Sequence, residues 1–86
     1  MMRRYIVCRK AHERRAVWVV TDGDRVHGDY LSEWTALLDA VDAAQWTGEA
    51  GVPAEVVVKR QGSPVDLCWS FGTDRYPLEA MTLQAR

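Results

Sequence analysis

The sequence predicts an α+β protein in which one helix packs on one face of a mainly antiparallel five-stranded sheet. Two observations lead to this class. Five short segments are rich in β-branched and aromatic residues, and one longer segment has apolar residues at helical spacing. Turn-forming residues separate these segments, which gives the element order β-β-β-α-β-β. The 86 residues leave room for one small domain, with a core expected over residues 3–73 and a C-terminal tail over 74–86.

The first three segments predict consecutive strands over residues 4–9, 16–21 and 25–30. The first two are apolar on both faces, so we expect them at the centre of the sheet. The third is short and polar, which suits an edge. Asp22-Gly23 is a turn dipeptide between the second and third strands, because glycine accepts positive φ angles.

The helix is expected to begin after Ser32, whose hydroxyl can accept a hydrogen bond from a backbone amide of the first turn. Gly48 or Gly51 ends the helix, and Pro53 prevents its continuation. The predicted helix must lie on one face of the sheet, because its apolar stripe needs an apolar partner.

The spacing of large residues defines the face of the helix that we expect to be buried. This stripe comprises Trp34, Leu37, Leu38, Val41, Ala44 and Gln45. Asp39 and Asp42 fall on the other side, and Trp46 lies off the stripe. We therefore expect Trp34 in the core and Trp46 to be partly exposed.

The last two strands are expected over residues 54–60 and 65–71, joined by a turn at 61–64. The fifth strand alternates regularly between Val65, Leu67, Trp69 and Phe71 on one face and Asp66, Cys68 and Ser70 on the other. Trp69 is thus expected in the core. Residues 77–85 can form a short helix, although a segment of this length is marginal by itself.

Two strand orders agree with these elements. The third, second and first strands form one side of the sheet in both. The fully antiparallel order places the fifth strand beside the first, with the fourth at the edge, and is the preferred prediction. The alternative places the fourth strand beside the first as one parallel pair, with the fifth at the edge.

Charge is distributed unevenly along the chain, although the net charge is only −1. Residues 1–15 contain six basic side chains and one acidic side chain, so the remainder of the chain carries a net negative charge. No apolar run is long enough for a membrane span or a signal peptide, so we expect a cytoplasmic protein. Cys8 and Cys68 are expected to be reduced thiols.

The chain resembles a group of small uncharacterised bacterial domains, domain of unknown function 2188, over residues 5–77. The matching features are Tyr5 with Val7, Trp18 with Val20, the helix residues Ser32, Ala36, Ala40 and Ala44, Val56–Val58, Arg60 with Gly62, and Gly72 with Pro77. The glycine that such domains often place before the tryptophan is Val17 here. Because this family has no established activity, the resemblance implies a fold and no chemistry.

No catalytic site, metal site or cofactor is expected. The stretch TDGDRVHGD at residues 21–29 is rich in acids, but an EF-hand loop would need an oxygen ligand where Val26 stands. His12-Glu13 lacks the second histidine of a metalloprotease helix, because Ala16 occupies that position. We expect His27 to be exposed on an edge strand. The residues are explained more simply as a hairpin turn with solvated charges.

Two functions from different classes remain. The preferred one is a non-enzymatic protein-interaction module that associates with itself, because one helix leaves the second face of a doubly apolar sheet without cover. A C-terminal tail folded onto that face is the competing cover, and an unknown protein partner is the other possibility.

The alternative is a nucleic-acid-binding accessory protein, in which a basic rim surrounds aromatic rings of the sheet. Either function would use a candidate binding site that comprises Arg9, Lys10, Arg14, Arg15, Tyr5 and Trp18. Membrane binding is not expected.

Overall fold

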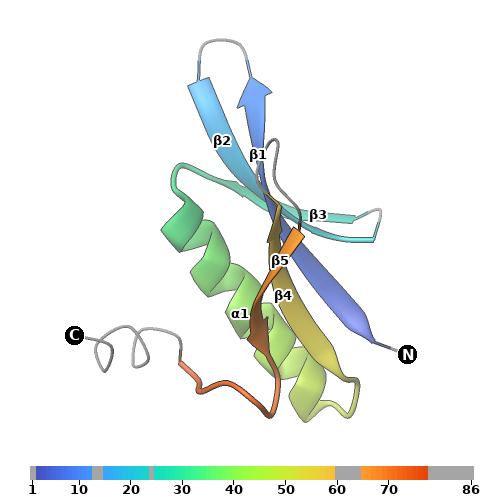
Figure 1. Ribbon diagram of the computed structural model, residues 1–86. Coiled ribbons are helices and arrows are strands. Elements are labelled where there is room, and N and C mark those ends of the chain that lie inside the picture. Colours follow the sequence, from blue (N-terminus) through green and yellow to red (C-terminus); the bar gives the residue numbers. More distant parts are fainter. Residues whose placement is uncertain (1, 13–14, 24, 60–64, 78–86) are drawn as a thin grey trace, which may run out of the picture.

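A five-stranded sheet with a single long helix on one face forms the body of the protein (Figure 1). The computed structural model describes residues 2–12, 15–23, 25–59 and 65–77, without the side chains of 11, 12, 15, 16 and 65–67. The elements are β1 (Arg3–His12), β2 (Arg15–Asp22), β3 (Arg25–Tyr30), α1 (Glu33–Glu49), β4 (Ala54–Lys59) and β5 (Val65–Ser70). The predicted α+β class and element order are confirmed.

The strand order is β3-β2-β1-β4-β5, with β1 and β4 parallel and every other pair antiparallel. The preferred, fully antiparallel order is therefore wrong, and the alternative with one parallel pair is correct. The burial of β4 supplies the reason. Val56, Val57 and Val58 are consecutive and all buried, which requires cover on both faces and hence an interior position. β5 takes the edge instead.

The main core lies between α1 and one face of the sheet. Register places Tyr5 and Val7 of β1 beside Val56 and Val58 of β4 on this face. The buried cluster comprises Tyr5, Val7, Val20, Ala36, Ala40, Val41, Ala44, Ala54, Val56, Val58 and Trp69. The interior positions of β1 and β2 and the edge position of β3 are confirmed.

α1 turns Val41 and a row of alanines toward the sheet, so the predicted burial of Val41 and Ala44 is confirmed. Ala36, Ala40 and Ala44 are completely buried, because short side chains let the helix approach the strands closely. Trp34 is 42% exposed, so its predicted place in the core is wrong. Trp46 is 73% exposed, as expected.

Both ends of α1 agree with the sequence. The Thr35 backbone N–H donates to Ser32 Oγ at 3.1 Å, which confirms the N-cap. The helix ends at Glu49, and Gly51 follows with a φ of 99°, in the left-handed region that favours glycine. No helix in the described part of the chain is long and apolar enough to cross a membrane.

A β-bulge interrupts the expected alternation along β5. Val56 pairs with Trp69, but the next residue of β4, Val57, pairs with Leu67, so Cys68 is the additional residue. Cys68 packs against the helix-side core, contrary to the predicted opposite face, while Trp69 is completely buried, as expected. The predicted helix over 77–85 lies almost wholly outside the described residues.

The second face of the sheet is less open than its composition suggests. Val19 and Val57 in its centre are each only 4% exposed, although neither belongs to the helix-side cluster. Ile6, Cys8 and Val17 beside them are half-buried. Most of the exposed large apolar side chains in the described part of the chain lie elsewhere.

Candidate functional site

A pocket of about 380 Å³ lies between the edge strand β3 and the helix α1. We call it the β3–α1 pocket. Volumes of a few hundred Å³ are typical of small-ligand sites. Among the described residues, its walls come from four parts of the chain and comprise Val20, His27, Tyr30, Asp39, Asp42, Ala43, Trp46 and Tyr76. This described lining combines three aromatic rings with two carboxyl groups and one imidazole.

The rotation of α1 determines which helix residues reach the pocket. Because the alanine stripe is buried against the sheet, the flanking residues Asp39, Asp42 and Trp46 face outward. They follow one another at intervals of three and four residues, and therefore lie along one side of the helix. The same rotation that exposes Trp46 brings two acidic side chains into line with it.

Each carboxylate of the pocket accepts a hydrogen bond from a tyrosine. The Tyr30 hydroxyl donates to Asp39 Oδ2 at 2.6 Å, and the Tyr76 hydroxyl donates to Asp42 Oδ1 at 2.6 Å. Burial raises the pKa of Tyr30 to about 12, and the hydrogen bond and charge of Asp39 add to this rise. Tyr30 therefore stays protonated at physiological pH and can donate to Asp39.

The segment after β5 places Tyr76 against the helix. Ser70 N–H donates to Asp74 Oδ2 at 2.9 Å, which stabilises the turn that follows the strand. Trp69 Nε1–H then donates to the Arg75 carbonyl at 2.9 Å. A buried side chain thus holds the backbone immediately before Tyr76, whose ring meets the Trp69 ring edge-on at 6.5 Å.

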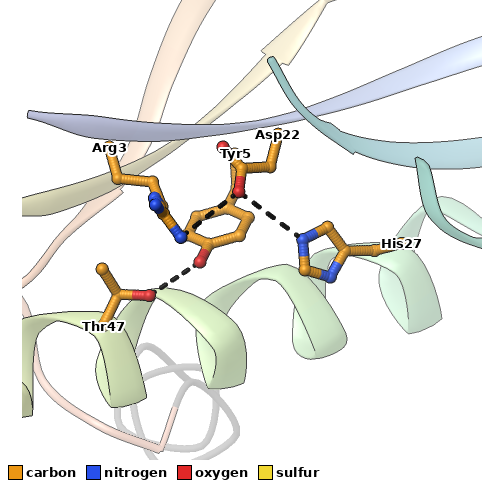
Figure 2. Close-up of polar contacts among 5 residues, drawn as sticks. All are labelled: Arg3, Tyr5, Asp22, His27 and Thr47. Carbon is orange, nitrogen blue, oxygen red and sulfur yellow. Dashed lines mark hydrogen bonds and ion pairs between the residues drawn. The ribbon is translucent and has the colours of Figure 1, made fainter. Parts of the chain in front are cut away.

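His27 connects the pocket to a polar network on the sheet (Figure 2). Figure 2 shows the Asp22 carboxylate between Arg3 Nη1, at 3.5 Å, and His27 Nε2, at 3.9 Å. The Tyr5 ring meets the His27 ring edge-on at 5.2 Å, and its hydroxyl shares a 2.7 Å hydrogen bond with Thr47 Oγ1 of α1. Asp22 and His27 are therefore occupied by neighbours in the chain. As expected, His27 is exposed.

Metal binding finds no support in this arrangement. Among the residues that the structure describes, no group of three or more histidine, cysteine or acidic side chains could hold a metal ion. The chemistry that the pocket offers is negative charge beside aromatic rings.

Arg9 and Lys10, two of the predicted site residues, lie on a part of β1 and β2 that projects from the sheet (Figure 1). Among the described residues, β4 pairs with β1 as far as Cys8, and residues 9–12 pair only with residues 15–18. We call these two segments the basic ribbon. Arg9 pairs with Trp18 on the helix side, and Lys10 lies on the opposite face.

The other predicted site residues are less accessible or not described. Trp18 is half-buried and packs against the core. Tyr5 is 2% exposed and lies four residues from Arg9, about 13 Å along the strand, so its expected stacking role does not fit its burial. Arg15 is described only by its backbone, which pairs with His12, and Arg14 lies outside the described residues.

The β3–α1 pocket was not predicted from the sequence. Its best signal was the position of Asp39, Asp42 and Trp46 off the apolar stripe. No local pattern pointed to Tyr30 or Tyr76, since they reach the helix through tertiary contacts.

Comparison of the chain with protein-family models, with curated proteins and with solved structures gave no match. The resemblance to domain of unknown function 2188 therefore stays a prediction.

Proposed function

We propose that this protein is a non-enzymatic interaction module that binds an acidic partner through its basic ribbon, and that a second copy of the chain is such a partner. The observation that carries the proposal is that β1 and β2 project beyond Lys59, the last residue of β4. Trp18 joins this element to the core, while the side chains of Arg9 and Lys10 are exposed.

The charges of the basic ribbon support this role. Arg9 and Lys10 are exposed and lie on opposite faces of the ribbon. Neither forms an ion pair with another described residue. Arg14 and Arg15 belong to the same turn region in the sequence. A cluster of positive charges on an extended element attracts a negatively charged surface and increases the rate of association with it.

The helix supplies a matching surface on a second copy. α1 contains Glu33, Asp39, Asp42 and Glu49 and no lysine or arginine. The last three of these acids are exposed. Contact between the ribbon of one copy and the helix of another joins two different surfaces, so it is a head-to-tail association.

Sedimentation velocity over a concentration series tests self-association. We expect oligomers at high micromolar concentration that dissociate as salt is added, because exposed charges are screened. Arg9→Gln should weaken association by about two- to fivefold, the usual effect of one exposed charge. Arg25→Gln is the matched control, because it removes the same charge from an exposed position outside the ribbon. A monomer at every concentration, or equal effects of both variants, would contradict the proposal.

Nucleic acid is the second candidate partner, since the major groove of DNA admits a two-stranded β-ribbon. The burial of Tyr5 and the net charge of −1 argue against stacking and against strong attraction to phosphate. One variant distinguishes the two candidate partners. If Arg9→Gln reduces binding to a labelled DNA duplex, and not self-association, nucleic acid is the partner.

We also propose a cytoplasmic location. The sequence contains two cysteines, Cys8 and Cys68, and so few cysteines are typical of a reducing compartment. Membership of the bacterial family that the sequence resembles remains part of the same proposal.

A further inference from the structure

We propose that the β3–α1 pocket binds a small organic cation of the quaternary ammonium class. It concerns a ligand and not a second copy of the chain, although Asp39 and Asp42 also belong to the acidic helix surface that the proposed self-association uses. It concerns a site that no sequence motif indicated. It rests on the combination of aromatic rings, volume, and carboxylates that have no counterion among the described residues.

The aromatic rings provide the first part of the argument. Tyr30, Trp46 and Tyr76 come from β3, α1 and the segment after β5, and they converge on one pocket. The π-electrons of such rings attract cations, and tryptophan is the strongest of the three aromatic types in this respect. Trp46 is 73% exposed, so its indole adds little to the core and remains accessible to a ligand.

The carboxylates provide the second part. Asp39 and Asp42 receive their hydrogen bonds from neutral phenols, not from lysine or arginine. No described residue with a permanent positive charge lines the pocket or forms an ion pair with either aspartate. The phenols orient the carboxylates without neutralising them, so the pocket holds two negative charges with no counterion from the described chain.

The environment selects the class of cation. Ca²⁺ and Mg²⁺ take six or more oxygen ligands, whereas the described lining offers two carboxylates already bonded to phenols. A quaternary ammonium ion has no N–H to satisfy, so charge and aromatic contact are sufficient to bind it. The volume of about 380 Å³ is at the small end of the range for ligand pockets, which favours a compact free cation.

Choline is the probe that we would use, with its uncharged tert-butyl analogue, in which carbon replaces nitrogen, as the matched control. Calorimetric titration should be done at a protein concentration where sedimentation shows one species. We expect choline to bind about tenfold more tightly than the neutral analogue, the effect of a cation–π contact combined with a nearby carboxylate.

Three variants connect binding to the pocket. Trp46→Leu should weaken choline binding by about tenfold, because it removes a ring from an exposed position. Asp42→Asn should also weaken it by about tenfold, while the asparagine oxygen can still accept the Tyr76 hydrogen bond. Trp34→Leu is the control, because Trp34 is a second exposed tryptophan of the same helix that does not line the pocket. It should leave binding unchanged.

Several results would overturn the assignment. Equal affinity for choline and its neutral analogue would show that the pocket recognises apolar groups and not charge. If neither compound released or absorbed heat on titration, the pocket would not be a binding site for this class of ligand. Equal losses in Trp46→Leu and Trp34→Leu would place the binding elsewhere. If a peptide with trimethyllysine bound more than about tenfold more tightly than choline, the ligand would be a modified protein chain and not a free cation.

Discussion

Replacement of Trp69 by alanine should cause the largest loss of stability among the tryptophan substitutions. Trp69 is completely buried and is the largest of the fully buried side chains. Tryptophan-to-alanine changes in a core cost about 3–5 kcal/mol, because they remove buried apolar contacts and leave a cavity behind. The substitution also removes the hydrogen bond that Trp69 Nε1–H donates to the Arg75 carbonyl.

The total stability of the protein determines how this loss is measured. For 86 residues the free energy of unfolding is expected to be about 4–13 kcal/mol. Trp69→Ala therefore removes a large fraction of the stability and can unfold the chain. Trp69→Phe is a milder second variant, because it keeps an aromatic ring and loses mainly the N–H donor, at a cost of about 1–2 kcal/mol.

Urea denaturation followed by far-UV circular dichroism measures both variants. With a slope of about 1 kcal/mol per molar urea, Trp69→Ala should lower the midpoint by about 3 M or more. Trp34→Ala is the control, because Trp34 is 42% exposed, and it should cost less than about 1 kcal/mol. If Trp34→Ala were as costly as Trp69→Ala, the rotation of α1 described above would be wrong.

Two further predictions concern close packing and alkaline pH. Gly48→Ala should destabilise the fold by about 1–3 kcal/mol, because an added Cβ would clash with the Phe71 ring. In a Phe71→Ala background the same change should become neutral or stabilising by helix propensity, and a persistent cost would refute the clash. Burial raises the pKa of Tyr30 from about 10 to about 12, so its contribution to stability is complete below pH 10 and is lost as the pH rises through 12. The difference in unfolding free energy between the wild type and Tyr30→Phe should therefore shrink over that interval, and a constant difference would argue against the shift.

The location of every strand and of the helix could be predicted from the sequence, because hydrophobic periodicity and turn residues act locally. Ser32 illustrates this, since its capping hydrogen bond depends only on residues within one helical turn. The central positions of β1 and β2 also follow from composition, because strands that are apolar on both faces need cover on both.

The rotation of α1 about its own axis could not be predicted fully from the sequence. The predicted stripe contained Val41 and Ala44, which are buried, but also Trp34, which is 42% exposed. Ala36 and Ala40 are buried instead. Which face is buried depends on how closely the helix can approach the strands, and that distance is set by side chains on the opposing surface. The bulge at Cys68 has a similar origin, because it depends on the pairing between β4 and β5.

The elements, their order, the basic character of the first fifteen residues and the acidic character of the helix all follow from local sequence. Only tertiary contacts place β4 beside β1, put Arg9 and Lys10 on a two-stranded ribbon, and bring Tyr30 and Tyr76 to Asp39 and Asp42. This difference comes from distance along the chain. Local patterns act over a few residues, whereas Asp42 and Tyr76 are 34 residues apart and are brought together only when the helix, the sheet and the segment after β5 share one core.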